Sequence, residues 1–222
     1  MLLGLVLGQG AVLPAENPET LLNRWLATHT NLQSLGADFV QTRTLRSLTQ
    51  PLTTPGRLWF AAPASFRWEL GNPAQTIAVR QTHDLWVIYP VQKRAERYEL
   101  QGANSHWRET LALLEAGFPR SRAELEARYR IASLTLTNEL LVVVLIPRHV
   151  AARRLIPELS LGVGATDHRL RFTSLKMADG SQMRQDYTNI VHNPAWTESP
   201  FKWAPPADYQ VVEPLARRPR GP

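Results

Sequence analysis

The sequence of 222 residues contains no cysteine, and this absence excludes several kinds of protein. Disulfide scaffolds, thiolate zinc sites, cysteine nucleophiles and an N-terminal lipid-modified cysteine all need this residue. Lysine is also scarce, because 22 of the 25 basic residues are arginine. Three of these arginines lie in the last six residues (Arg217, Arg218 and Arg220), so half of the net charge of +6 belongs to a C-terminal tail. The charge balance is therefore weak support for nucleic-acid binding.

Long apolar runs are missing as well, and no stretch approaches the roughly 20 apolar residues that span a bilayer. Residues 1–15 combine a short apolar run with small residues and lack a basic start. Two interpretations stay open: the end of a secretory signal that begins upstream, or a short apolar tail of a cytosolic protein. In both cases we expect one domain over residues 16–213. Residues 214–222 then form a basic tail, either disordered or docked on an anionic membrane surface.

Motifs of catalysis and metal binding are absent too. The sequence holds no HExxH, no GxSxG and no phosphate-binding loop, and none of its six histidines has the i, i+4 spacing of a helical metal pair. Gly162-Val163-Gly164 lacks the third glycine of a dinucleotide-binding loop and is expected to be a turn. We therefore predict that the protein is no enzyme and needs neither cofactor nor metal.

What the sequence does contain is the alternation of a mainly β protein with a few helices. Asn17-Pro18-Glu19 predicts a helix start, and the apolar spacing continues until near Gly36. Apolar spacing also predicts a helix over 104–118, and the Ser121/Glu124 pair predicts a second, short one. Alternation with period two predicts about ten antiparallel strands in meander order. The segments are 37–49, 57–61, 65–70, 75–80, 84–89, 93–100, 129–136, 139–146, 155–163, 168–176, 182–191, 201–204 and 208–212.

Large apolar side chains are concentrated in the first half of this predicted sheet. They form either an ordinary sandwich core or the lining of a cavity. An antiparallel sheet of about ten strands curls or closes, and a curled sheet with such side chains on its concave face encloses a ligand site. The candidate cavity residues are Phe39, Leu58, Phe60, Phe66, Trp68, Leu70, Ile77, Val79, Trp86 and Ile88. The candidate lid residues are Trp107, Leu111, Leu114 and Phe118.

Several short strings occur together in an order and spacing typical of one family. They are Ala37-Asp38-Phe39-Val40-Gln41-Thr42, Gly56-Arg57-Leu58-Trp59-Phe60, Phe66-Arg67-Trp68, Leu85-Trp86 before Tyr89-Pro90, Asp179-Gly180 and Phe201-Lys202-Trp203-Ala204-Pro205-Pro206. Over roughly residues 20–213 the sequence resembles LolA, the soluble periplasmic carriers of lipoproteins. The resemblance implies an incomplete antiparallel β-barrel covered by short helices, with an acyl-binding cavity.

The resemblance also implies partners for a soluble, monomeric protein of the periplasm. These are acylated lipoproteins, an inner-membrane ABC transporter as donor, and a LolB-like acceptor at the outer membrane. Because that acceptor is anchored through a lipidated cysteine, the lack of cysteine favours the carrier. The family's arginine before the third-strand proline, which holds the lid shut, is replaced by Ala62 before Pro63. Arg57 and Arg67 are the candidate substitutes for this latch.

The sequence leaves three alternatives to a lipoprotein carrier. The first is a carrier or sensor for a different acylated lipid on the same fold. The second is a hydrolase of acyl substrates, which is disfavoured because no histidine lies on the aromatic-rich strands to act as a base. The third is a nucleic-acid binder, which is disfavoured because Arg67 alternates with Phe66 and Trp68 and so lies on the other face of the strand.

Overall fold

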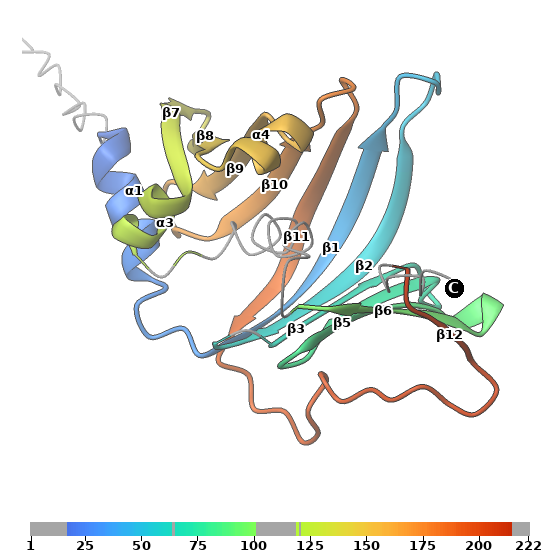
Figure 1. Cartoon of the computed structure of the whole chain (residues 1–222). Helices are drawn as coiled ribbons and strands as arrows, with labels where there is room; N and C mark the ends of the chain where they lie inside the picture. Colours follow the sequence, from blue (N-terminus) through green and yellow to red (C-terminus); the bar gives the residue numbers. More distant parts are fainter. Residues whose placement is uncertain (1–16, 64, 101–118, 120, 215–222) are drawn as a thin grey trace, which may run out of the picture.

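The computed structural model describes residues 17–63, 65–100, 119 and 121–214, which form one strongly bent β-sheet with three short α-helices (Figure 1). The helices are α1 (Pro18–Ala27), α3 (Arg122–Arg128) and α4 (Val150–Leu155), with a 3-10 turn η1 (Pro90–Gln92). The strands are β1 (Ser34–Thr44), β2 (Leu52–Ala61), β3 (Ser65–Leu70), β4 (Thr76–Arg80), β5 (Asp84–Tyr89), β6 (Arg94–Glu99), β7 (Tyr129–Thr137), β8 (Leu140–Pro147), β9 (Glu158–Gly164), β10 (Leu170–Lys176), β11 (Gln182–His192) and β12 (Gln210–Val212).

The sheet consists of two antiparallel meanders joined side by side. The first runs from β1 to β6 and the second from β7 to β11, and the pairing of β1 with β11 connects them. The short strand β12 adds to β6 in parallel, so β7 and β12 are the two edges and the sheet stays open. The predicted mainly β fold with an incomplete antiparallel barrel is thus confirmed, with 12 strands in place of about ten.

Short connections with residues at positive φ help the second meander to fold back on itself. Asn138 and Glu139 connect β7 to β8 with φ angles of 50° and 59°. Positive φ at both central residues is the geometry that matches the twist of a hairpin. Asp179-Gly180 is typical of a two-residue hairpin turn between strands. The structure places the pair in a longer connection, residues 177–181 between β10 and β11, with Gly180 at φ 85°. The local turn residues therefore determine the order of these neighbouring strands.

The helix starts follow the capping residues. Asn17 accepts a hydrogen bond from the Glu19 N–H at 2.9 Å, and the Ser121 side chain accepts one from the Glu124 N–H at 3.1 Å. Both predicted starts are confirmed, but α1 ends at Ala27 and not near Gly36. The chain turns there because β1 begins at Ser34 and must pair with two strands.

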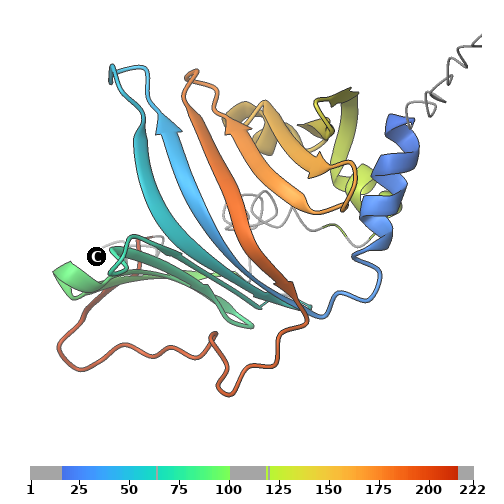
Figure 2. The same ribbon diagram turned by 180° about the vertical axis from the view of Figure 1, so that it is seen from behind.

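Several further boundaries differ from the prediction. Strand β1 ends at Thr44 and not at residue 49, and β2 begins at Leu52 and not at residue 57. Residues 162–164, which were expected to be a turn, are the last three residues of β9. Helix α4 lies just before β9 and was not expected, since it has no side-chain hydrogen bond at its N-cap. Residues 201–204 were predicted as a strand, and this prediction is wrong, because they lie in an irregular segment. That segment, residues 193–209, is called the strap here. It runs along the convex face of the sheet before β12 (Figure 2).

The two faces of the sheet are covered by different parts of the chain. On the concave, inner face, α1 buries Leu21, Leu22 and Trp25 completely against the sheet. On the convex, outer face, the strap packs Trp203 on Trp86, with ring centroids 4.9 Å apart. None of the described helices is long and apolar enough to cross a membrane.

Candidate functional site

The first meander presents an apolar wall on the inner face. Register places Leu58 opposite Trp68 and Phe60 opposite Phe66, so these four side chains point the same way. Strands β1 to β3 thus bring together six of the ten predicted cavity residues on one face: Phe39, Leu58, Phe60 and Phe66, which are buried, and Trp68 and Leu70, which are half-buried.

An aromatic stack forms the centre of this wall. The Phe39 ring lies parallel to Trp68, with centroids 6.0 Å apart and an interplanar angle of 15°. The Tyr187 ring of β11 also contacts Phe39, in an edge-on arrangement with the two ring centroids 6.2 Å apart. Gly56 makes this packing possible, because a Cβ there would collide with the Phe39 ring and would lie 2.5 Å from the Glu69 carbonyl oxygen. The stack therefore joins the two meanders across the β1–β11 seam.

The other four predicted cavity residues lie on the opposite face. The strand register pairs Ile77 with Glu69 and Val79 with Arg67. Arg67 and Glu69 flank Trp68 on β3, so their side chains point to the face opposite that of Trp68. Ile77, Val79, Trp86 and Ile88 consequently belong to the outer apolar cluster under the strap, with Ala95, Trp203 and Tyr209. The ten predicted residues therefore do not line one hollow, because these four lie on the outer face. These four side chains are apolar because the strap covers them. The sequences of β4 and β5 alone do not show that a distant segment covers this face.

Both candidate latch arginines also point outward. Arg57 is exposed and forms an ion pair with Asp38 at 3.5 Å. Arg67 donates to Glu69 at 2.7 Å and to the Pro200 carbonyl of the strap at 3.2 Å. A side chain on the outer face cannot close a lid over the inner face, so neither arginine replaces the family's latch.

The predicted lid residues Trp107, Leu111, Leu114 and Phe118 lie outside the described residues. Their role stays a prediction from the sequence.

The second meander contributes an aliphatic half of the wall that sequence reasoning missed. The signal was the apolar run of residues 140–146, in which both faces of the strand are apolar. Cross-strand pairs such as Leu145 with Leu159 place these side chains on the inner face. The fully or almost fully buried members are Leu141, Val143, Leu145, Leu159, Leu161, Val163, Leu170 and Leu175.

A buried polar ladder crosses the same inner face near the seam. The Tyr187 hydroxyl lies 2.9 Å from Gln185 Oε1 and 3.1 Å from Thr173 Oγ1, and Gln185 donates to Gln41 at 3.4 Å. Burial raises the pKa of Tyr187 to about 12, so the phenol stays neutral. Mutual hydrogen bonding lets these polar groups lie in an apolar wall without a large desolvation cost.

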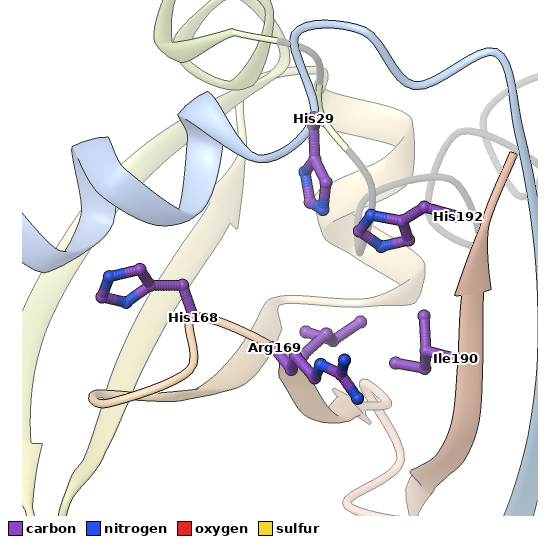
Figure 3. A pocket seen from close by; sticks show the side chains of 6 residues that line it. His29, His168, Arg169, Ile190 and His192 are labelled. Atoms are coloured by element: carbon purple, nitrogen blue, oxygen red, sulfur yellow. The ribbon is translucent and has the colours of Figure 1, made fainter.

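A small cavity of about 180 Å³ lies between the end of α1 and the end of β11, lined by His29, His168, Arg169, Leu170, Ile190 and His192 (Figure 3). His29 Nδ1 lies 3.0 Å from the Pro119 carbonyl oxygen, so this nitrogen donates. Desolvation lowers the pKa of His29 to about 4, and also lowers that of His192, whose ring is 5.8 Å away. At neutral pH the cavity thus holds an uncharged, buried His29.

We expect acid to destabilise the protein through His29. Because the folded pKa is about 4 and the unfolded value 6.5, the unfolded chain binds more protons between these values. Stability is therefore lost as pH falls from about 6.5 to 4, by roughly 3 kcal/mol from this group. Burial is the main cause of the lowered pKa of His29, and the charge of His192 contributes to it.

Urea denaturation of a His29→Gln variant at several pH values checks this expectation. The variant should lose less stability than the parent between pH 6.5 and about 4, whereas His149→Gln, at an exposed histidine, should follow the parent. Parallel pH profiles for His29→Gln and the parent would contradict the assignment.

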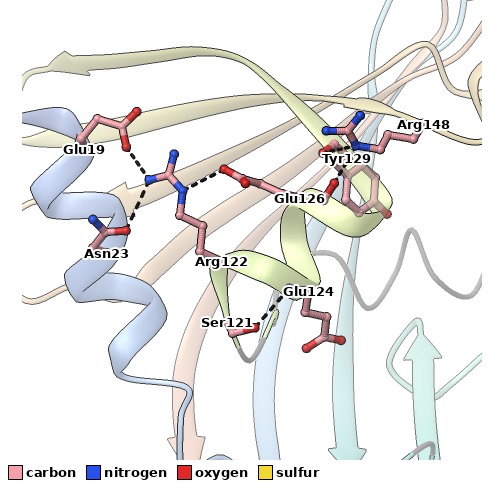
Figure 4. A network of polar contacts seen from close by, with 8 residues as sticks. All are labelled: Glu19, Asn23, Ser121, Arg122, Glu124, Glu126, Tyr129 and Arg148. Carbon is pink, nitrogen blue, oxygen red and sulfur yellow. Dashed lines mark hydrogen bonds and ion pairs between the residues drawn. The ribbon is translucent and has the colours of Figure 1, made fainter.

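The two helices at the far end of the inner face are held together by one arginine (Figure 4). Arg122 of α3 contacts Glu19 of α1 at 2.5 Å and Glu126 of its own helix at 2.8 Å. Arg148 Nε donates to the Glu126 carbonyl at 2.6 Å and links α3 to the end of β8. These polar contacts fix the helices while their apolar sides pack on the sheet.

Comparison with known protein families decides the relationship. The family profile described as "Outer membrane lipoprotein carrier protein LolA" matches residues 30–204. The chain belongs to the LolA family. The resemblance seen in the sequence strings is thereby confirmed, and the family description names its members as carriers. No curated protein matches the sequence.

Solved structures with a similar fold share little sequence with this LolA-family chain. An uncharacterised conserved protein from Thermus thermophilus is 12% identical, with a TM-score of 0.49 over 88% of this chain and 98% of the other. A LolA superfamily protein from Nitrosomonas europaea is 12% identical, with a TM-score of 0.40 over 82% of this chain and 96% of the other. The Mycobacterium tuberculosis lipoprotein LppX is 12% identical, with a TM-score of 0.42 over 82% of this chain and 100% of the other.

The described residues contain no group of three or more His, Asp or Glu side chains placed to hold a metal ion. The polar side chains of the ladder on the inner face, Gln41, Thr173, Gln185 and Tyr187, are instead hydrogen-bonded to each other. What the wall offers chemically is apolar surface with a few hydrogen-bonding groups, as in a binding site for a hydrophobic ligand.

Proposed function

We propose that this LolA-family protein is a soluble periplasmic carrier that binds the acyl chains of lipoproteins on its inner face. The observation that carries the proposal is the extended apolar wall of that face, with the Phe39–Trp68 stack at its centre. The family description supports lipoprotein as the cargo.

The energetics of this task require an extended apolar surface. A lipid anchor is held in a membrane by about 0.8 kcal/mol for each buried CH₂ group. A carrier must replace most of that contact, or the extraction of an acylated protein would be too costly. The inner face has apolar residues on both meanders, from Leu70 on β3 to Leu145 on β8. A surface of this extent suits long chains better than a small polar ligand.

One polar group of the wall is suited to the ester end of an acyl chain. The indole Nε1 of Trp68 is buried and has no hydrogen-bond acceptor in the described part of the chain. An ester carbonyl of a bound lipid would accept from this N–H group. A donor beside the aromatic stack thus offers a way to orient the cargo without binding it tightly.

The proposed cycle needs a donor and an acceptor. We infer that an inner-membrane ABC transporter loads the carrier and a LolB-like protein of the outer membrane unloads it. The carrier acts as a monomer, takes part in outer-membrane biogenesis as a chaperone for acyl chains, and binds no nucleic acid. It performs no chemistry on the cargo and needs no cofactor.

A second candidate is a carrier or sensor for a different acylated lipid on the same fold. The departure at the latch favours it: Ala62 stands before Pro63, and both Arg57 and Arg67 form their contacts on the outer face. A member without the usual latch would hold its cargo differently.

Native mass spectrometry of the protein purified from a Gram-negative periplasm tests the proposal. We expect a retained lipopeptide or acylated protein, and its mass then identifies lipoprotein as the cargo. A retained free lipid would favour the second candidate. A mass without any adduct, together with no uptake of a fluorescent fatty acid, would contradict both.

A further inference from the structure

Three segments that are far apart in the sequence meet at one end of the long strands. They are the β1–β2 connection with the first residue of β2 (residues 45–52), helix α4 (Val150–Leu155), and the last residue of β10 with the β10–β11 connection (residues 176–181). Both ribbon views place them at the same end of the sheet (Figures 1 and 2). We call these three segments together the rim.

Hydrogen bonds make the rim continuous. The Ala178 N–H donates to the Leu155 carbonyl at 3.0 Å, which attaches the end of α4 to the β10–β11 turn. Arg46 donates to the Asp179 carbonyl at 3.2 Å, and a Cβ added at Gly180 would lie 3.3 Å from Cδ of the Arg46 side chain. The three segments therefore form one surface.

Exposed apolar side chains are concentrated on this surface. The described residues include eight large hydrophobic side chains that are exposed, and four of them belong to the rim. Leu48, Leu52, Val150 and Leu155 are 44%, 49%, 52% and 54% exposed. Single exposed apolar residues are ordinary, but half of the set within three short contacting segments marks an interaction surface.

The rim is also basic. It carries Arg46, Arg153, Arg154 and Lys176 against one acidic residue, Asp179, so four positive charges and one negative leave a net charge of +3. The Asp179 carboxylate accepts hydrogen bonds from the Ser181 N–H and hydroxyl, which satisfy it locally. Arg154 and Lys176 are exposed to solvent.

We propose that the rim docks the protein on the surface of an anionic lipid bilayer. Basic side chains attract acidic headgroups, and adjacent aliphatic side chains enter the boundary between headgroups and acyl chains. A nucleic acid would need exposed aromatic side chains for base stacking, whereas the apolar side chains exposed on the rim are aliphatic. This docking is a property of the rim and does not depend on the inner face.

The test is co-sedimentation of the full-length protein with phosphatidylcholine vesicles that contain about one-third phosphatidylglycerol. We expect binding that falls with added salt and is weak on pure phosphatidylcholine. The double variant Arg154→Gln/Leu155→Ser should bind at least tenfold more weakly, since one basic residue near such a surface accounts for about fivefold. The matched variant Arg57→Gln/Val91→Ser changes one exposed arginine and one exposed apolar residue outside the rim, and should bind like the parent.

Two further variants separate the rim from other sources of binding. Replacing Arg217, Arg218 and Arg220 by serine removes the basic charge of the tail, and an inner-face variant removes lipid uptake. We expect both to keep rim-dependent sedimentation. The proposal is overturned if the parent does not bind anionic vesicles, if the rim variant sediments like the matched control, or if only the tail variant loses binding. Rim-dependent capture of a protein partner without vesicle binding would also overturn it.

Discussion

Replacing Trp68 with glutamate is expected to abolish lipid binding while the fold survives. Trp68 is half-buried on the inner face, where its ring stacks on Phe39. Loss of roughly 100 Å² of apolar contact at about 25 cal/mol per Å² weakens binding close to a hundredfold. The buried carboxylate adds a desolvation penalty. Titration with a fluorescent fatty acid measures the effect, and far-UV circular dichroism checks the fold.

The same substitution on the neighbouring strand supplies the control. Trp59 is also half-buried but points to the outer face, where the Arg67 guanidinium lies 6.0 Å from its ring centroid. Trp59→Glu places a carboxylate near that arginine and should leave fatty-acid affinity within about threefold of the parent. Equal loss in both variants would remove the distinction between the two faces, and unchanged binding in Trp68→Glu would remove β3 from the binding site.

Gly56→Ala is expected to destabilise the protein by about 3 kcal/mol, the upper end of what overpacking costs in a core. The added methyl group would overlap the Phe39 ring and lie 2.5 Å from the Glu69 carbonyl oxygen, which belongs to the backbone and cannot rotate away. Phe39 must therefore move and lose its stack with Trp68. Urea denaturation measures the stability, and the near-ultraviolet circular dichroism signal of the aromatic residues reports the stack.

Gly36 provides the matched position for this second experiment. It lies on β1 in the same pair of strands, but the nearest atoms to an added Cβ are 4.0 Å away. Gly36→Ala should change the free energy of unfolding by less than about 0.5 kcal/mol. A large loss at both glycines would mean that the strands tolerate no side chain at these positions for a general reason, and the stack would not be the cause.

Local sequence patterns predicted most of the secondary structure because those patterns act over a few residues. Asn17 and Ser121 cap their helices as expected, and Asp179-Gly180 turns the chain between two strands. The six inner-face residues of β1 to β3 were predicted to share one face, because backbone geometry fixes the alternation of side chains within each strand. Helix α4 was missed because its start lacks a side-chain cap.

The predicted site was only partly right because alternation does not say which apolar face of a strand meets which partner. Ile77 and Trp86 are apolar on account of the strap, whose Trp203 approaches from more than 100 residues further along the chain. A shift of one residue in the pairing of β3 with β4 would have placed them inside. The cavity of His29 and His192 likewise needed the end of α1 to meet the end of β11.

The sequence by itself determined most of the strands, the helix starts at Asn17 and Ser121, and the membership of a lipoprotein-carrier family, since each depends on short strings of residues. Only the tertiary structure decided which side chains share the inner face, where the latch arginines point, and that three distant segments form a basic, apolar rim. These features depend on strand register and on the pairing of β1 with β11, which are contacts between residues far apart in the chain. No local pattern encodes such contacts, because their free energy is gained only when the whole sheet is assembled.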